Sequence, residues 1–574
     1  MLNATPEASE AFKETLMQRP LLHLRTQLWE QRPDLEEDAS LDRYTRAIEE
    51  CGLVGELPAT ETGKCARTAA ALRAQGNRKY VARDYRSALL KYNESICHAG
   101  TESAELGLGY ANRSAVYFAM NEFELALANV ALAKEHHYPE PLMPKLVDRE
   151  QNCQAKLAED QSKGTIPKKR FELNVPVNPK IPFLADGIGM VRLEDFGRSM
   201  VATKSFAVGD VILHEKSILA SIDLMKQFQC CNLCSAVESL NLIPCPNCVT
   251  VMYCSRECLE RDFRLVHRFE CPIAEKVQHL CYGFVNLGTK LFFYGLSLFN
   301  DDLDEMMRYC DRVKDGGNPL KLDYTRYDPL EEWKELYNLS AVTNPDREGN
   351  YRFFVAMRCL MFLGCPLVKS IVVTEQHKAF MRQCVLDCTR AGSYYRFDVT
   401  SPLFPVQSLF NHSCDPNVQI SILSGHVKLV VIRPVRPGEQ ICFSYGFIWW
   451  DPQSNPLFQE KTPGVFECKC VVCDPIKKLE WQARKGRFNA EAKQALATII
   501  RTVRPSPKVD LIQLKVLENF IERHAAIAHP HKDFGLILSL YCRWIYLLLK
   551  DEDDALRRAK ILARLRGQST AEVD

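Results

Sequence analysis

The pattern of apolar and polar positions divides the chain into helical stretches at both ends and a strand-rich centre. Residues 1–65 show mixed helical patterning without a motif, whereas amphipathic helices follow one another from about residue 66 to 157. Residues 158–182 hold several prolines and scattered lysines and predict a linker. Residues 272–385 and 476–574 are helical again, so helices surround and interrupt the central part.

Strand-like alternation marks the centre. Residues 201–219 predict two short strands around a turn at Gly209 and Asp210. Alternation returns between residues 395 and 446, where Val427, Leu429 and Val431 recur at every second position. The expected class is therefore an α+β multidomain protein with a β-rich centre.

Two segments of the N-terminal helical region resemble each other. Small and aromatic residues such as Gly76, Ala88 and Tyr92 have the spacing of two packed helices, and about 38 residues later Ala126 matches Ala88. Small residues allow two helices to approach closely, while aromatic rings fill the groove between them. The pattern resembles tetratricopeptide (TPR) repeats over residues 66–157, with an unrelated helical hairpin as the alternative.

Composition excludes several classes of protein. The chain has 574 residues, enough for three or more domains, and 73 Lys and Arg balance 72 Asp and Glu, so no overall charge favours nucleic acid or an anionic membrane. No signal peptide or apolar run of membrane-spanning length is recognisable. We expect a reducing compartment, nucleus and cytoplasm, with Lys168, Lys169 and Arg170 as either a nuclear signal or a solvated loop.

The 24 cysteines are concentrated in short segments, which favours metal sites over disulfides. Residues 230–271 hold two Cys-x2-Cys pairs and two pairs spaced i, i+4, and each kind of pair can place two ligands on one ion. Eight ligands suffice for two zinc ions, which would supply much of the folding energy of so short a segment. The candidates are Cys231, Cys234, Cys245, Cys248, Cys254, Cys258, His267 and Cys271.

This spacing, with Tyr253 before Cys254 and a closing His-x3-Cys, resembles the MYND zinc finger. The resemblance implies interleaved ligands: Cys231, Cys234, Cys254 and Cys258 on one ion, and Cys245, Cys248, His267 and Cys271 on the other. Cys230 is expected to be a spare thiol. MYND fingers bind proteins, often proline-containing peptides, and the segment has no basic patch for DNA.

Residues 403–446 contain Asn411-His412-Ser413-Cys414 and, later, Ser444-Tyr445. This resembles the SET domain of lysine methyltransferases and, with the finger, the SET and MYND domain-containing family, in particular its TPR-bearing fourth type. The resemblance implies a β-rich SET core split by the finger and by a helical insert, flanked by N-terminal TPR-like helices and a C-terminal helical domain, TPR-like by resemblance.

The domain boundaries follow from the patterning and the resemblance. They are 1–65 for an N-terminal helical segment, 66–157 for the TPR-like repeats, 158–182 for the linker, 183–229 for the first SET part, 230–271 for the finger, 272–385 for the insert, 386–447 for the SET core, 448–475 for a post-SET zinc segment and 476–574 for the C-terminal domain.

The resemblance also implies the site and its cofactors. Tyr445 would be catalytic, orienting the substrate amine, and S-adenosylmethionine (SAM) would contact Gly197, Arg198, Asn411, His412, Tyr445 and Phe466. Cys468, Cys470 and Cys473 are one thiolate short of a closed tetrahedral site, and Cys414 would complete a third zinc site.

The expected function is SAM-dependent methylation of lysine in histone or non-histone proteins, with further protein partners on the TPR and MYND modules, and no direct nucleic-acid or membrane binding. The alternative is an adaptor with a weak or inactive SET core that recruits partners. Ser199 and Gly464, which replace residues common in active relatives, favour the alternative, whereas Asn411, His412 and Tyr445 favour the enzyme.

Overall fold

The computed structural model covers the whole chain and describes most of it. The described residues are 20–35, 39–56, 63–161, 171–222, 226–237, 241–277, 283–312, 317–338, 345–392, 400–451, 468–484, 489–503, 509 and 511–565. The basic tripeptide at 168–170 and Phe466 lie outside them. Among the described helices, none combines the length and the apolarity that crossing a membrane requires.

Five antiparallel helices form the N-terminal bundle. Gly76 of the first helix faces the ring of Tyr92, and a Cβ at this glycine would lie 2.5 Å from that ring, which explains the small residue found in the sequence pattern. The helices are α4 (Ala66–Val81), α5 (Tyr85–His98), α6 (Ala104–Ala119), α7 (Phe123–Glu135) and α8 (Met143–Gln161).

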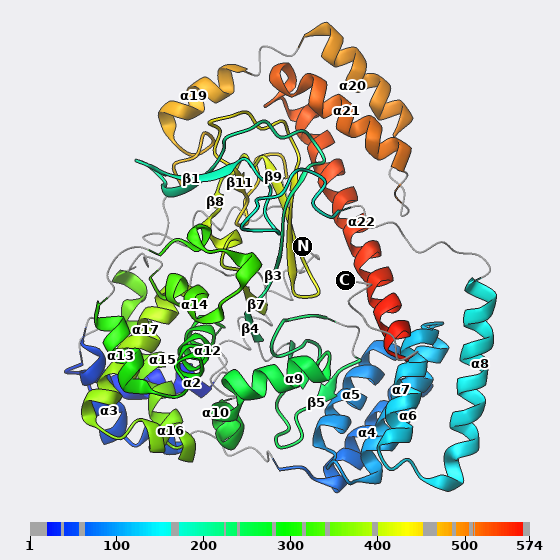
Figure 1. The fold of residues 1–574 in the computed structure, drawn as a ribbon, viewed down its shortest axis with the longest axis vertical. Coiled ribbons are helices and arrows are strands. Elements are labelled where there is room, and N and C mark those ends of the chain that lie inside the picture. Colours follow the sequence, from blue (N-terminus) through cyan, green and yellow to red (C-terminus); the bar gives the residue numbers. More distant parts are fainter. Residues whose placement is uncertain are drawn as a thin grey trace.

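The first of the described helices do not join this bundle. Helices α2 (Pro20–Gln31) and α3 (Leu41–Glu50) lie against the helical insert, on the opposite side of the molecule (Figure 1). Leu28, Tyr44 and Ile48 are fully buried in the core that they share with the insert. Burial of this apolar face, rather than proximity in sequence, therefore determines where the segment packs.

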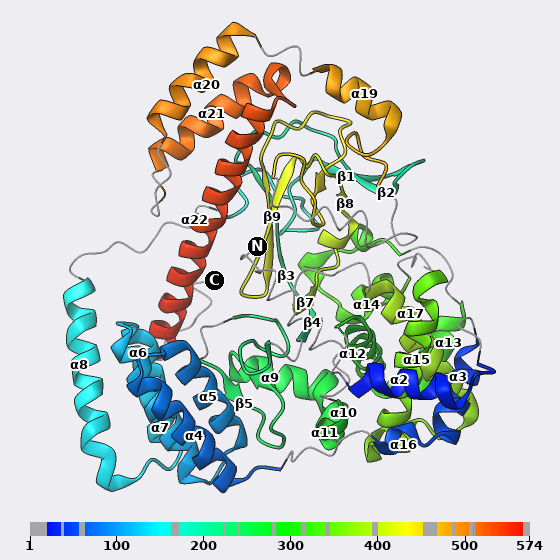
Figure 2. The ribbon, with the colours of Figure 1, turned by 180° about the vertical axis from the view of Figure 1, so that it is seen from behind.

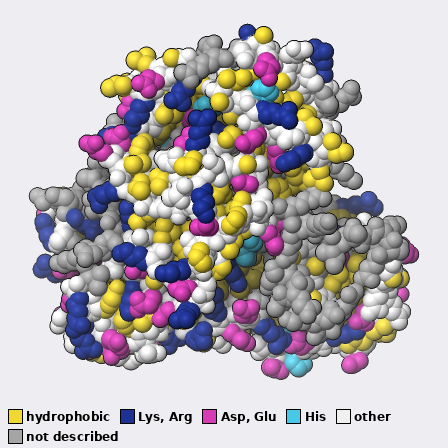
Figure 3. Space-filling view, turned by 45° about the horizontal axis from the view of Figure 1, so that its top comes forward, with side chains coloured by type: hydrophobic (Ala, Val, Ile, Leu, Met, Phe, Trp, Pro, Cys, Tyr) yellow, Lys and Arg dark blue, Asp and Glu magenta, His cyan; other side chains and the backbone are white. Residues whose placement is uncertain are grey.

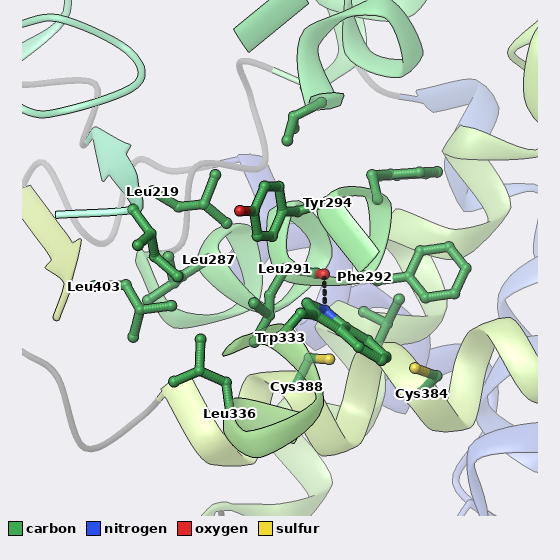
Figure 4. Packing of buried hydrophobic residues seen from close by; sticks show 14 of the residues in the cluster. Leu219, Leu287, Leu291, Phe292, Tyr294, Trp333, Leu336, Cys384, Cys388 and Leu403 are labelled. Atoms are coloured by element: carbon green, nitrogen blue, oxygen red, sulfur yellow. Dashed lines mark hydrogen bonds between the residues drawn. The ribbon is translucent and has the colours of Figure 1, made fainter. Parts of the chain in front are cut away.

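The insert is a cluster of helices around Trp333. The indole of Trp333 is fully buried and donates a hydrogen bond to the Leu291 carbonyl oxygen at 2.9 Å (Figure 4). A Cβ at Gly295 would lie 2.2 Å from the same indole, so only glycine permits this approach. The helices are α12 (Gly283–Leu298), α13 (Leu303–Arg312), α14 (Pro329–Tyr337), α15 (Pro345–Phe362), α16 (Pro366–Ile371) and α17 (Glu375–Gly392).

The central strands form several small sheets. Strands β1 (Ile188–Leu193) and β2 (Gly197–Ala202) pair with each other, and β3 (Val211–Lys216), β10 (His426–Val431) and β9 (Val418–Leu423) form a three-stranded antiparallel sheet. The two strands expected around Gly209 are thus β2 and β3, which belong to different sheets. The other pairs are β4 (Leu219–Ile222) with β7 (Thr400–Leu403), β5 (Ile243–Pro244) with β6 (Met252–Tyr253), and β8 (Asn411–His412) with β11 (Cys442–Phe443).

The finger, residues 230–271, lies between the N-terminal bundle and the insert. It contains α9 (Arg256–Asp262) and α10 (Arg268–Glu270), and α11 (Ala274–Val277) follows it. The C-terminal helices are α19 (Pro475–Ala483), α20 (Ala490–Thr502), α21 (Leu511–Ala528) and α22 (Lys532–Leu565).

Helix α22 links two distant parts of the molecule. Its 34 residues correspond to about 50 Å of helix, and it runs from α20 and α21 beside the sheets to the N-terminal bundle (Figure 2). There Ile561 is buried among bundle side chains, and Arg558 pairs with Glu122 at 2.9 Å. A cavity of about 370 Å³ lies between this helix, the finger and the β3–β10–β9 sheet.

Charged side chains of both signs are interspersed over the face drawn in Figure 3, among apolar ones. This distribution agrees with the nearly balanced total of 73 basic and 72 acidic residues. The surface of this face therefore lacks the single-sign field typical of nucleic-acid-binding proteins.

Candidate methyltransferase site

The site is built where β8 and β11 pair in parallel beside the start of β2. The side-chain amide of Asn411 donates hydrogen bonds to the Arg198 carbonyl oxygen at 2.8 Å and to the Ser199 hydroxyl at 3.1 Å. Its Oδ1 atom accepts no recorded hydrogen bond from the described residues. Asn411 therefore fixes the backbone of β2 through one end of its amide and leaves an acceptor for a ligand at the other.

Gly197 begins β2 with a φ of 63°, a left-handed conformation that favours glycine. A Cβ at this position would meet no described atom within 4 Å, so open space lies above the backbone. The next side chain, Arg198, donates to the Gly317 carbonyl oxygen at 2.9 Å, in the loop before Pro319. Gly197 therefore leaves room beside Asn411 in which a ligand can approach the main chain.

His412 and Tyr445 are held in contact with each other. The Tyr445 backbone N–H donates to His412 Nδ1 at 2.9 Å, so the imidazole proton lies on Nε2, which faces Cys414 Sγ at 3.3 Å. The Tyr445 hydroxyl donates to the Phe410 carbonyl oxygen at 2.9 Å. Both ring nitrogens of His412 are thus engaged by the protein, and a contact of this residue with a ligand would have to come from its main chain or ring face.

Cys414 lies within a group of four cysteines. Its Sγ atom is 3.5 Å from that of Cys473 and 3.9 Å from that of Cys468, and Cys470 completes the group. A tetrahedral zinc ion with Zn–S bonds of about 2.3 Å requires sulfur atoms about 3.8 Å apart, so the group fits zinc. An ion here would anchor residues 468–473 directly beside the Asn411–His412 strand.

The finger brings together two further groups. In the first, Cys254 Sγ lies 3.7 Å from that of Cys234 and 3.5 Å from that of Cys258. In the second, Cys245 and Cys271 are 3.8 Å apart, and His267 Nε2 lies 3.4 Å from Cys248. The groups are Cys231, Cys234, Cys254 and Cys258, and Cys245, Cys248, His267 and Cys271, the interleaved sets expected from the resemblance; Cys230 lies outside both.

The chemistry of these groups also suits a metal ion. Hydrogen bonds from neighbouring thiols lower the pKa of Cys258 in the finger and of Cys468 in the third group, so each group favours a thiolate, the form that binds zinc. His267 Nδ1 lies 3.4 Å from the Glu270 carboxylate, a partner that orients a ligating imidazole.

The residue after Cys414 was missed by the sequence analysis. Asp415 is only 4% exposed. Its carboxylate accepts hydrogen bonds from the indole N–H of Trp449 at 2.8 Å and of Trp481 at 3.1 Å, and from His529 at 2.8 Å. Burial alone would raise the pKa of Asp415, but Arg433 and His529 hold it well below its usual range. Asp415 therefore joins the Cys414 segment to the C-terminal helices.

Glu215 of strand β3 is a second buried carboxylate that the sequence analysis missed, since His214 and Lys216 beside it are also polar. It accepts the backbone N–H groups of Val406 at 2.8 Å and of Gln407 at 2.7 Å. Burial raises its pKa to about 8, despite these two donors. Glu215 therefore positions the segment that leads into Asn411.

The raised pKa of Glu215 predicts a pH dependence of stability. The Glu215 carboxyl keeps its proton in the folded protein but releases it in the unfolded chain, where its pKa is ordinary. The contribution of Glu215 to the free energy of unfolding is therefore lost as pH rises toward 8. Between pH 6.5 and 8.5 we expect about 2 kcal/mol of unfolding free energy to be lost. Urea titrations at several pH values should show that Glu215→Gln flattens the pH dependence of the free energy of unfolding. An unchanged pH dependence in this variant would contradict the raised pKa of Glu215. Burial also raises the pKa of Glu332, to about 7. Because Glu332 is present in both the wild-type protein and Glu215→Gln, its contribution cancels when the two are compared.

Comparison with known proteins identifies the fold around this site. Residues 197–446 match the SET domain family model. Protein-lysine N-methyltransferase SMYD4 of Danio rerio is 25% identical over 423 residues, which cover 63% of this chain and 56% of the relative. The SMYD4 protein of Homo sapiens is 21% identical over 541 residues, which cover 70% of this chain and 66% of that protein.

A SET and MYND domain-containing protein of Dictyostelium discoideum is 23% identical over 327 residues, covering 53% of this chain and 55% of that protein. The chain thus spans less than two thirds of the length of each of these curated relatives. The matched segment contains Gly197, Asn411, His412 and Tyr445, together with both cysteine groups of the finger. The chain therefore contains a SET domain and is similar in sequence to SET and MYND domain-containing (SMYD-type) proteins.

Proposed function

We propose that this protein is a SAM-dependent protein-lysine N-methyltransferase. The observation that carries the proposal is the convergence of Gly197, Asn411 and Tyr445 beside a four-cysteine group. The open space at Gly197 and the available Oδ1 atom of Asn411 fit a ligand with an amino group, such as the methionine part of SAM. When bound, SAM supplies an electrophilic methyl group on its sulfonium.

The residues of the chain have distinct tasks in this reaction. Asn411 holds β2 and offers an acceptor to the cofactor, while His412 fixes the main chain of Tyr445. Tyr445 presents a half-buried ring and a hydroxyl, whose hydrogen bond to Phe410 fixes its direction. A substrate lysine that enters beside this ring leaves water, which lowers its pKa and favours the neutral, nucleophilic amine. Positioning then supplies much of the rate enhancement.

The proposal extends to the cofactors and partners. Three zinc ions, two in the finger and one at Cys414, Cys468, Cys470 and Cys473, agree with the three ligand groups. The substrate is a histone or non-histone protein, and the N-terminal helices, proposed as TPR-like, and the finger are proposed to bind further proteins rather than nucleic acid. We further propose that Arg198, His412 and Phe466 contact SAM, that the chain is divided into the nine segments given above, and that the protein is located in nucleus and cytoplasm.

Isothermal calorimetry with SAM and zinc-loaded protein tests the cofactor site. Asn411→Ala should weaken SAM binding at least tenfold, because it removes an acceptor for a charged group. Asn417→Ala is the matched control, since Asn417 bonds the main chain of Cys442 and Gln440 rather than Arg198 or Ser199. It should lose stability but keep SAM affinity. Failure of folded wild-type protein to bind SAM would refute the proposal and favour an adaptor.

Transfer of tritiated methyl groups from SAM to histones and to proteins of a cell extract tests catalysis. Tyr445→Phe should keep SAM affinity but slow transfer by a factor on the order of 100, because the amine loses its orientation. Unaltered transfer by Tyr445→Phe would remove Tyr445 from the mechanism.

A further inference from the structure

A short segment of the finger, Asn241–Leu242, lies against the N-terminal bundle, in a site lined by Ile96, Tyr110, Arg113 and Val130 that we call the N-terminal groove. Strand β5 brings this segment against α5 (Figure 1). Leu242 is fully buried in a cluster that includes Ile96, Tyr110 and Val130 of the bundle. The Leu242 carbonyl oxygen accepts a hydrogen bond from Arg113 Nη1 at 2.8 Å. The bundle thus recognises an apolar side chain and its main chain together.

Arg113, at the floor of this groove, is a buried cation surrounded by neutral groups. It is 0% exposed, and its guanidinium donates to Asn93 and Asn129 side chains, each at 2.6 Å. The Tyr110 ring lies 5.2 Å from its central carbon. Burial lowers the pKa of Arg113, and no carboxylate of the described residues contacts it. A buried charge with no opposite charge is poorly compensated.

Asn241 occupies the position that a compensating charge would take. Its Oδ1 atom accepts from Asn129 Nδ2 at 2.7 Å and, more weakly, from Arg113 Nη2 at 3.3 Å. Its amide nitrogen makes no recorded hydrogen bond within the described residues. An aspartate of the same size would offer one oxygen to each of these two donors and place a negative charge beside the guanidinium.

We propose that the N-terminal groove is a binding site for a protein segment in which aspartate precedes leucine, and that Asn241–Leu242 is a weaker resident ligand. Leucine fills the apolar pocket, its carbonyl oxygen binds Arg113, and the aspartate carboxylate neutralises that cation. This binding site is independent of the proposed methyl transfer.

Exchange of the resident segment does not require the finger to leave the bundle. Lys64 Nζ donates both to the Cys97 carbonyl oxygen of α5, at 2.7 Å, and to that of Cys245 in the finger, at 2.6 Å. Asn93 also donates to the Phe228 carbonyl oxygen at 2.8 Å. These contacts, together with Val249 and Met252 of the finger in the same buried cluster, attach the finger to the bundle independently of Asn241 and Leu242.

A substitution within the chain tests the preference for a carboxylate. Asn241→Asp should raise the urea midpoint of the full-length, zinc-loaded protein, and the gain should vanish in the Arg113→Met background. Asn152→Asp, on the exposed face of α8, adds the same charge away from the groove and should leave the midpoint unchanged. An equal effect of Asn241→Asp in both backgrounds, or a loss of stability in the wild-type background, would overturn the proposal.

Binding from solution is measured with two fluorescein-labelled peptides, Ser-Leu-Asp-Leu-Ile-Pro and Ser-Leu-Asn-Leu-Ile-Pro, the second being residues 239–244 of this chain. Leu242→Ala vacates the apolar pocket. The full-length Leu242→Ala protein should bind the aspartate peptide at least tenfold more tightly than the asparagine peptide. Adding Arg113→Met to this variant should abolish the preference for aspartate. Absent binding, or equal affinities, for a folded Leu242→Ala protein would overturn the proposal. If that variant fails to fold, the Asn241→Asp comparison still decides.

Discussion

Replacing Cys470 by serine should remove one of the three proposed zinc ions and abolish the proposed tight binding of SAM. Cys470 is a buried member of the group that joins Cys414 to residues 468–473. Serine is a poor zinc ligand, and three remaining ligands no longer form a closed structural site. Structural zinc contributes about 10 kcal/mol or more in small zinc-binding domains, so its loss should release this segment from the site.

Loss of this zinc ion should weaken the binding of SAM through two contacts. Cys414 Sγ accepts from His412 Nε2, and His412 Nδ1 accepts from the Tyr445 backbone, so displacement of Cys414 alters both residues. We expect SAM affinity to fall at least a hundredfold, equivalent to about 3 kcal/mol, in calorimetry. Elemental analysis should find two zinc ions per chain, both in the finger.

Cys442 offers the matched control for this experiment. It is a buried cysteine of β11, adjacent in space to the third group but not part of it, and burial raises its pKa to about 12, which keeps it a protonated thiol. Cys442→Ala should retain three zinc ions and bind SAM like the wild-type protein. Full zinc content in Cys470→Ser, or loss of an ion in Cys442→Ala, would contradict the assignment of the third site.

The pairs of neighbouring zinc ligands were predictable because their geometry is local. A Cys-x2-Cys turn and a pair spaced i, i+4 each place two ligands on one ion whatever the rest of the fold does. The interleaving of Cys231 with Cys254 came from the resemblance to MYND fingers, since spacing alone leaves several pairings open. The described structure brings the same groups of side chains together.

The buried polar residues were not predictable, because their partners lie far away along the chain. Arg113 meets Leu242 and Asp415 meets His529, across more than a hundred residues in each case. Nothing in the local pattern distinguishes such residues from solvated ones. For the same reason the patterning marked α2 and α3 as helical without indicating that they pack on the insert rather than on the N-terminal bundle.

The assignment of individual SAM contacts was possible only by resemblance. The structure places Gly197, Arg198, Asn411, His412 and Tyr445 close together through the β2–Asn411 hydrogen bonds and the β8–β11 pairing. Phe466 lies outside the described residues, and the SAM contacts of all six residues stay predictions. The orientation of His412 toward Cys414 could not be inferred from the motif, because it depends on the backbone position of Tyr445.

Asp415→Ala should be among the most destabilising single substitutions in this chain. The carboxylate is 4% exposed and accepts from Trp449, Trp481 and His529. Removing it leaves these donors unsatisfied in the interior and leaves Arg433, whose guanidinium lies 3.6 Å away, without its opposite charge. Loss of one partner of a buried ion pair costs about 3–5 kcal/mol, so the urea midpoint should fall accordingly.

Two variants separate the charge of Asp415 from its hydrogen bonds. Asp415→Asn keeps the shape and one acceptor oxygen, and Trp481→Phe removes a single donor, which should cost about 1 kcal/mol. Because Trp481 belongs to α19 and His529 lies between α21 and α22, Asp415→Ala should also loosen the C-terminal helices from the SET domain. Limited proteolysis should then release a C-terminal fragment from Asp415→Ala but not from Trp481→Phe. A loss below 1 kcal/mol in Asp415→Ala would show that this carboxylate does not join the two parts.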